Sequence, residues 1–189
     1  MARFPETHEA IGHTSLNSGI VSFQVPTELP NADEVLVRVL YIVVSPVDLW
    51  HADYNFLDFS YPNVFGETLV GEIVQVGENA DSDFAVGDKV FSFSPEVTKV
   101  KARAFQEYAT LSRWSIGKVP HNITLQEVVT VPNNLVTVFA AFVSDLGLTI
   151  PTELPASQSP PEASTPILVF DVLRNGVSGE KVVISVSKS

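Results

Sequence analysis

The clearest alternation of hydrophobic and polar positions lies in residues 34–40, which read EVLVRVL. This places Val35, Val37 and Val39 on one side of an extended chain, because successive side chains of a strand point to opposite faces. The apolar run 41–44 continues the segment without alternation, as is typical of a strand covered on both faces. The pattern therefore predicts a long strand that is buried on at least one side.

Two shorter strands are expected within residues 66–93, GETLVGEIVQVGENADSDFAVGDKVFSF. The first ends at Gly77, where a polar connection begins. The pair Gly87-Asp88 then precedes a run rich in valine and phenylalanine. Glycine and aspartate favour turns because glycine tolerates positive φ and aspartate can bond nearby backbone groups. The segment is thus interpreted as strand, turn and strand.

Apolar residues dominate the chain from 128 to 142, which predicts buried helix. Thr124 and Glu127 have the spacing of a capping box at its start. Pro132 cannot continue a helix without a break, so two helices over about 125–130 and 133–146 are expected rather than one.

Composition narrows the class of protein. The chain has 189 residues, of which 45% are hydrophobic, so it can bury the core of one domain or slightly more. The net charge of −11 argues against nucleic acid and anionic membranes as partners, since both require clustered lysine and arginine. The densest basic group, Lys99, Lys101 and Arg103, is interpreted as a solvated strand face.

Cellular location is constrained by what the sequence lacks. There is no cysteine, which excludes disulfides, thiolate metal sites and a cysteine nucleophile. The first ten residues have no apolar signal-peptide region, and no apolar run approaches the roughly 20 residues of a membrane span. A cytoplasmic protein that does not associate with membranes is expected.

Three motifs carry a resemblance to a known family. They are the glycine-bounded segment 66–93, the tetrapeptide Ser45-Pro-Val-Asp48 and the segment Ala104-Phe-Gln-Glu-Tyr-Ala109. Together they closely resemble the GroES-like catalytic domain of the medium-chain dehydrogenase/reductase family. The resemblance implies a mainly β fold with a few helices, arranged as a partly open β-barrel. It also implies NADPH as the cofactor of the parent family.

The resemblance also names candidate residues for a substrate cleft: Ser45, Asp48, Trp50, Tyr54 and Thr137, the last near the nicotinamide in relatives. Ser45 stands where zinc-dependent members have a cysteine ligand, which is similar to the zinc-free, fungal enoyl-reductase and quinone-reductase-like branch. Serine is a poor zinc ligand. In the same way Glu67 takes the place of a zinc-binding histidine, followed by Thr68. No metal is therefore expected.

Other candidates for chemistry have simpler explanations. The aromatic residues of 49–61 either line a binding wall or cover the core, and the sequence leaves both possibilities open. His51 is interpreted as a packing or surface histidine, and no histidine pair has metal-ligand spacing. Glu107 is interpreted as a carboxylate that supports the barrel backbone rather than as an acid or base.

The second half of the family's architecture is missing from this sequence. Residues 165–170 resemble the first strand of the cofactor domain, but no glycine-rich turn for a dinucleotide follows. Residues 171–189 resemble the family's C-terminus, so no complete Rossmann domain is expected. The expected division is a catalytic domain (1–147), a proline-rich linker (148–166), a remnant strand (167–170) and a C-terminal segment returning to the catalytic domain (171–189).

Three functional hypotheses follow. The first is a truncated oxidoreductase-family protein that binds no NADPH alone and acts as a non-catalytic binding or oligomerising protein. A homo-oligomer would then form through apolar side chains that lack a covering domain: Leu135, Phe139, Phe142, Ile167 and Val169. The second is an active, zinc-independent, NADPH-dependent reductase of a small enone, enoyl or quinone substrate. The third is a folded remnant without a role.

Overall fold

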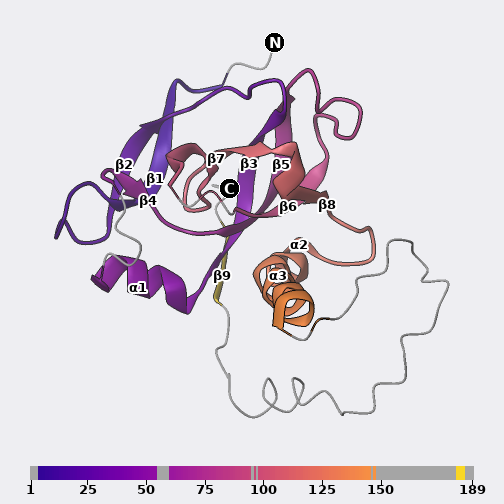
Figure 1. Ribbon diagram of the computed structural model, residues 1–189. Coiled ribbons are helices and arrows are strands. Elements are labelled where there is room, and N and C mark those ends of the chain that lie inside the picture. Colours follow the sequence, from indigo (N-terminus) through magenta and orange to yellow (C-terminus); the bar gives the residue numbers. More distant parts are fainter. Residues whose placement is uncertain are drawn as a thin grey trace. The chain divides into compact units, whose positions relative to one another are not determined.

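The computed structural model describes residues 4–54, 60–94, 96, 98–145, 147 and 182–185 (Figure 1). Backbone contacts divide the chain into two units. The first contains residues 1–134 and 181–189, and the second contains residues 135–180. The strands and the buried core described below belong to the first unit.

Two antiparallel sheets form the first unit. The smaller sheet has the order β2 (Val21–Pro26), β1 (Thr7–His13) and β4 (Asn63–Val64). The larger sheet has the order β7 (Tyr108–Ser112), β3 (Glu34–Val44), β5 (Thr68–Val76), β6 (Lys89–Phe93) and β8 (Ile116–Lys118). The sheets do not join into one closed barrel, so the expected mainly β, partly open GroES-like architecture is confirmed.

The long strand β3 organises the larger sheet. One edge pairs with β5 over most of its length. The other edge pairs first with β7, from Glu34 to Arg38, and then with β9 (Val182–Ser185), from Tyr41 to Val44. Figure 1 shows β9, in yellow, beside the far end of β3. Two segments that are distant in sequence therefore share one edge of the same strand.

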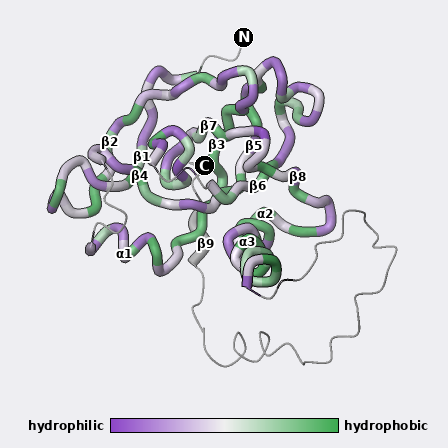
Figure 2. The backbone as a smooth tube through the Cα atoms, in the orientation of Figure 1, coloured by the Kyte–Doolittle hydropathy of each residue, from purple (hydrophilic) through white to green (hydrophobic). Residues whose placement is uncertain are grey.

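β3 is buried on the face that the sequence predicts, and Leu36 on the opposite face is buried as well. Val35, Val37 and Val39 are all nearly inaccessible to solvent, whereas Arg38 on the opposite face is exposed. The main core joins both sheets, and Figure 2 shows hydrophobic residues along β3 and β5. This burial of apolar side chains from two layers is the main force that holds such a unit together.

The turns expected around β5 and β6 are also present. β5 ends at Val76, directly before Gly77. Gly87 has φ +96°, a conformation that favours glycine, and the Asp88 carboxylate accepts a hydrogen bond of 3.0 Å from the backbone N–H of Ala85. The sequence signal for this turn is therefore confirmed.

The two helices expected after residue 124 are present, but the second is largely exposed rather than buried as expected. Besides α1 (Pro46–Tyr54) there are α2 (Leu125–Val128) and α3 (Pro132–Ala140), which continues as a π-helical turn to Asp145. The capping box of α2 is complete, because the Thr124 side chain accepts from the Glu127 N–H and the Glu127 carboxylate accepts from the Thr124 N–H. The break at Pro132 is confirmed. Two single-turn 3₁₀ helices, Val100–Ala102 and Arg113–Ser115, complete the described helices.

The expectation that no apolar segment is long enough to cross a membrane needs correction. By length and composition alone, the helical stretch Leu125–Asp145 would suffice to cross a membrane, although no apolar run of that size was expected. A single stretch of this kind is weak evidence of a span, since core helices of soluble proteins pass the same criterion. Pro132 also interrupts it. The linker 148–166 and the remnant strand 167–170 lie outside the described residues.

Candidate functional site

Ser45 and Asp48 form a local structure where β3 ends and α1 begins. Pro46 opens the helix, a position that proline suits because the first helical N–H has no partner there. One carboxylate oxygen of Asp48, Oδ2, accepts hydrogen bonds from the Ser45 backbone N–H at 2.7 Å and from the Ser45 hydroxyl at 3.1 Å. The negative charge in the first turn also suits the helix dipole. The two candidates are thus brought together by the start of the helix.

Arg103 lies within the core beside this helix start. The chain around it is paired with residues 64–66: the Phe105 N–H donates to the Phe65 carbonyl at 2.9 Å, and the Ala104 N–H donates to the Gly66 carbonyl at 3.1 Å. The Arg103 side chain is fully buried, and its Nε donates to the carbonyl of Val64 at 3.0 Å. Arginine is rarely buried without compensating partners.

The interpretation of the basic group as a solvated face is therefore wrong for Arg103. It also needs revision for Lys101, whose side chain is only 15% exposed and forms an ion pair of 2.9 Å with Glu34. Lys99, which is half-exposed and paired with Glu96, fits the expectation. The three residues have different surroundings because 100–102 form a 3₁₀ turn rather than an extended strand.

The electrostatics of this region are dominated by burial. Burial raises the pKa of Asp48, against the lowering effects of the Ser45 hydrogen bonds and of the Arg103 charge. Burial also raises the pKa of Glu67, which interacts with both Arg103 and Asp48. Burial lowers the pKa of Arg103, and the two carboxylates oppose that effect. One cation and two acids therefore influence one another in a site withdrawn from water.

His51 belongs to the same buried region. Its side chain is 1% exposed, so it is a packing histidine and not a surface one. Burial, with the nearby Arg103 charge, lowers its pKa to about 4. The imidazole is consequently neutral at physiological pH.

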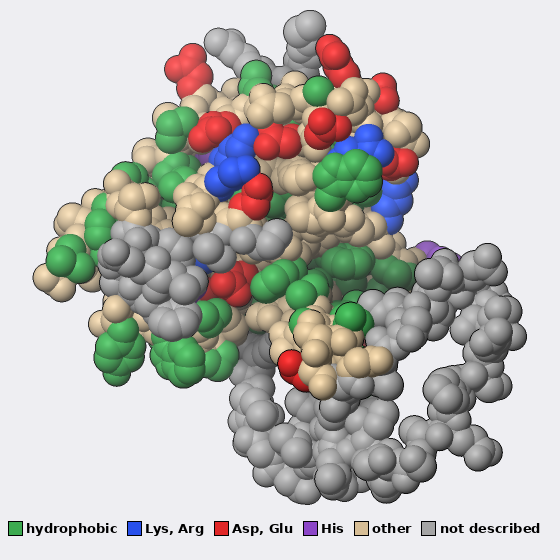
Figure 3. Space-filling model, in the orientation of Figure 1, with side chains coloured by type: hydrophobic (Ala, Val, Ile, Leu, Met, Phe, Trp, Pro, Cys, Tyr) green, Lys and Arg blue, Asp and Glu red, His purple; other side chains and the backbone are tan. Residues whose placement is uncertain are grey.

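The aromatic candidates of α1 face outward. Trp50 is 55% exposed and Tyr54 is 78% exposed, and the neighbouring Leu49 is exposed as well. Figure 3 shows hydrophobic side chains gathered on the surface in the region of α1. Of the two possibilities left open by the sequence, covering of the core does not apply to Trp50 or Tyr54. Thr137, the fifth candidate, lies exposed on α3, in the stretch assigned to the second unit.

The residues at this site do not fit a zinc ion. In the described part of the chain, no group of three His, Cys, Asp or Glu side chains could hold a metal. The Ser45 hydroxyl donates to Asp48, and a guanidinium occupies the same region. Zinc requires several deprotonated or neutral donors and is repelled by a neighbouring cation. No chemical step is therefore assigned to a metal.

Glu107 has the structural role that its sequence context predicts. Its carboxylate oxygen Oε2 accepts a hydrogen bond of 3.1 Å from the backbone N–H of Glu9. The backbone of Glu107 also links β1 and β3, through an N–H that donates to Glu9 and a carbonyl that accepts from Val39. This residue supports the junction between the two sheets.

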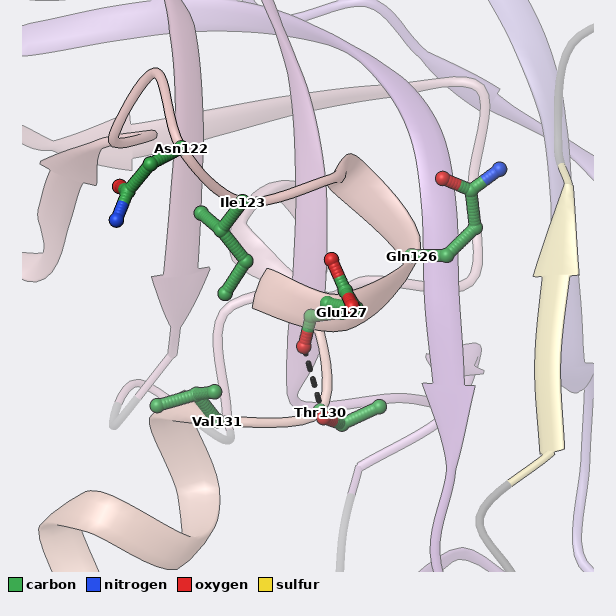
Figure 4. A pocket seen from close by; sticks show the side chains of 6 residues that line it. All are labelled: Asn122, Ile123, Gln126, Glu127, Thr130 and Val131. Carbon is green, nitrogen blue, oxygen red and sulfur yellow. Dashed lines mark hydrogen bonds between the residues drawn. The ribbon is translucent and has the colours of Figure 1, made fainter.

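A separate shallow hollow lies beside α2 (Figure 4). Two of its polar groups are engaged at the helix ends: the Glu127 carboxylate caps α2, and the Thr130 hydroxyl donates to the Glu127 carbonyl at 2.8 Å. The hollow contains none of the candidate residues and is therefore not the candidate site. It is lined by Asn122, Ile123, Gln126, Glu127, Thr130 and Val131.

Sequence reasoning missed Arg103 as a member of the site and gave Glu67 no role of its own. Ala102 and Ala104 on either side of Arg103 are small, apolar and fully buried. That composition was a signal for a buried turn rather than a solvated face. The pairing of residues 64–66 with 103–105 is a long-range contact, and no local pattern could reveal it.

Comparisons with known proteins agree with this architecture. Residues 31–140 match the family described as "Alcohol dehydrogenase GroES-like domain". The dehydrogenase pigH of Monascus ruber is 33% identical over 153 residues, covering 76% of this chain and 40% of its own length. The trans-enoyl reductase opdC of Penicillium oxalicum is 32% identical over 178 residues, covering 90% of this chain and 47% of its own length.

A solved structure shares the fold at lower identity. A putative zinc-dependent alcohol dehydrogenase of Rhizobium etli superposes with a TM-score of 0.63 at 21% identity, covering 80% of this chain and 45% of that one. In each of these three comparisons, this chain spans less than half of the relative's length.

Proposed function

Because the chain belongs to the family of alcohol dehydrogenase GroES-like domains, we propose that it forms the substrate-side domain of an NADPH-dependent oxidoreductase and does not turn over substrate by itself. The observation that carries this proposal is the extent of the match. The family segment 31–140 accounts for most of the described residues, and the chain corresponds to 40–47% of two oxidoreductases of similar sequence.

The missing part is the one that would bind the cofactor. A dinucleotide site needs a glycine-rich turn between a strand and a helix, so that backbone N–H groups can approach the pyrophosphate. Nothing in the sequence after residue 165 has that form; Gly176 and Gly179 precede an apolar run instead. Catalysis by this chain would therefore require a cofactor domain that these residues do not supply.

The substrate class follows from the relatives and from the surface of α1. The names of similar proteins include trans-enoyl reductases and dehydrogenases. The exposed apolar side chains Leu49, Trp50 and Tyr54 suit a small, partly apolar molecule. We propose an enone, an enoyl compound or a quinone, bound without zinc because Ser45 and Arg103 do not suit a metal.

Turnover and cofactor binding test this proposal directly. Purified protein is mixed with NADPH and an enal, an enoyl thioester or a quinone, and NADPH oxidation is followed by absorbance. Calorimetry measures NADPH binding separately. We expect no turnover and no binding. Measurable NADPH binding with turnover would overturn the proposal in favour of the active reductase.

A second proposal concerns association between copies. Leu135 and Phe139 on α3 are 46% and 44% exposed. Val136 and Val143 are exposed to a similar extent, and Phe142 is half-buried. Exposed apolar side chains in a group mark interaction surfaces. We propose a homo-oligomer that buries this group, with Ile167 and Val169, which lie outside the described residues, as further contacts.

Substitution on α3 is expected to dissociate this oligomer. The double variant Leu135→Ser, Phe139→Ser removes two large apolar contacts, so a dimer or larger assembly at micromolar concentration should become a monomer. Light scattering coupled to size exclusion measures the mass. Leu29→Ser, a change at a leucine of the first unit that is 58% exposed, serves as the control and should leave the mass unchanged. A wild-type monomer across this concentration range would contradict the proposal.

A further inference from the structure

The C-terminal strand β9 lies beside the part of β3 that leads into the candidate site (Figure 1). The two strands are antiparallel, so Val182 lies opposite Val44 and Ser185 lies opposite Tyr41. Val44 is the last residue of β3, and Ser45 follows it directly. The first residue of β9 is therefore paired with the residue that immediately precedes the candidate site.

In the described part of the chain, β9 is the only strand that pairs with the last two residues of β3. On one edge of β3, the pairing with β7 covers Glu34 to Arg38. On the other edge, the pairing with β5 ends at Ile42. Val43 and Val44 pair with β9 alone. Release of β9 would therefore leave the end of β3 without a paired residue on either side.

The candidate site is built on the next residue of the chain. The Ser45 N–H donates to Oδ2 of Asp48 at 2.7 Å, and the Ser45 carbonyl accepts from the Asp48 N–H at 3.0 Å. Both bonds involve the Ser45 backbone, which is placed by Val44 one residue earlier. Asp48 and His51 are the buried residues of α1. The position of α1 therefore depends on how the end of β3 is held.

β9 is a short strand at the end of a long connection. Residues 146–181 separate it from the π-helical turn that ends at Asp145. Closing a connection of this length costs conformational entropy, and β9 has only the pairs with Tyr41–Val44 to offset that cost. Segments with few contacts open at a lower free energy than the whole fold. We therefore expect β9 to detach while the rest of the larger sheet stays folded.

We propose that β9 is a positioning strand for the candidate site: its pairing with β3 holds Ser45 and α1 in place, and its release loosens them together. The C-terminal segment thereby controls the geometry of a site that is distant from it in sequence. The relevance of that site to a substrate rests on the proposed function, whereas the coupling between β9 and α1 does not.

Native-state hydrogen exchange of the wild-type protein tests the coupling without a variant. At low urea, the amides of residues 43–45, 50–54 and 182–185 should exchange through one opening, with a common free energy and a common dependence on urea. The amides of β5 should exchange only through a larger opening. Mass spectrometry of peptic fragments resolves these segments. Separate openings of β9 and α1, or exchange of all segments by global unfolding alone, would overturn the proposal.

Proline in β9 tests the role of its backbone. Adjacent residues of a strand direct their N–H groups to opposite sides, so Val183→Pro, Ile184→Pro removes one N–H that faces β3. Exchange of residues 43–45 and 50–54 should become about tenfold faster, as expected for about one lost hydrogen bond, while β5 stays protected. The matched variant Val183→Thr, Ile184→Val keeps both N–H groups and should change these rates by less than about threefold. Equal effects of the two variants contradict the proposal, as does loss of the whole fold in the proline variant, measured by circular dichroism.

Tryptophan fluorescence reports on α1 separately. Trp114→Phe leaves Trp50 as the only tryptophan of the chain. In that background the proline variant should shift the emission of Trp50 to longer wavelength, because a loosened α1 is more solvated, and the matched variant should not. An unchanged emission would show that α1 does not respond to β9, and the proposal would fail. None of these readouts uses substrate or NADPH, so a failure of the proposed function remains distinguishable from a failure of the coupling.

Discussion

Replacing Arg103 with methionine is expected to lower the free energy of unfolding by about 3–5 kcal/mol, the typical cost of removing one partner from a buried charged group. Methionine approximates the length of the arginine stem but carries no charge. The variant leaves Asp48 and Glu67 without their cation in a region that excludes water. It also leaves the Val64 carbonyl without the Nε donor. Urea unfolding followed by circular dichroism measures the change.

Two further variants make the Arg103 prediction specific. Arg38→Met removes an arginine whose side chain is 50% exposed and which pairs with Glu72 on the surface, and it should cost less than about 1 kcal/mol. Adding Asp48→Asn to Arg103→Met should recover part of the loss, because it removes one of the two uncompensated charges. An Arg103→Met variant that is no less stable than Arg38→Met would contradict the assignment of a buried cation.

Gly66→Ala is expected to destabilise the protein by about 2–4 kcal/mol, the sum of strain at positive φ and overpacking of the core. Gly66 has φ +83°, which only glycine adopts without cost. An added Cβ would also lie 2.1 Å from Cδ1 of the Phe105 ring, well inside contact distance. The backbone pairing that positions both Arg103 and Glu67 would be displaced. Thermal and urea denaturation give the size of the effect.

The matched control for Gly66 is Gly19→Ala. Gly19 has a similar φ of +71°, but no atom lies within 4 Å of its added Cβ. This control reports the backbone strain alone, which we expect to be about 1 kcal/mol. The excess of Gly66→Ala over Gly19→Ala then measures the steric contact with Phe105. Equal losses in the two variants would show that the ring moves away without cost.

Local patterns predicted the elements of this fold well. The alternation of Val35, Val37 and Val39, the capping box of Thr124 and Glu127, and the break at Pro132 are each set by residues close in sequence. The structural role of Glu107 was also inferred correctly, through the resemblance to a known family. In these cases neighbouring residues or a family motif contain the information.

The candidate site was less predictable because its members meet through long-range pairing. Arg103 was interpreted as solvent-facing from the charges at 99 and 101, yet it is buried by the segment 64–66. The family motif led to Ser45 and Asp48, which hydrogen bonds join in the structure. It gave no indication of which positive charge would act on the Glu67 carboxylate. A cation that long-range pairing brings beside these carboxylates cannot be identified from spacing alone.

The shared edge of β3 has a consequence for synthesis on the ribosome. Residues 34–38 can pair with β7 soon after residue 112 has emerged, whereas residues 41–44 must wait for residues 182–185. During that interval half of the strand offers unpaired N–H and C=O groups, which another nascent chain can pair with. Between the emergence of β7 and that of residues 182–185, this edge is therefore the part of the strand that a chaperone would need to shield from pairing with another chain.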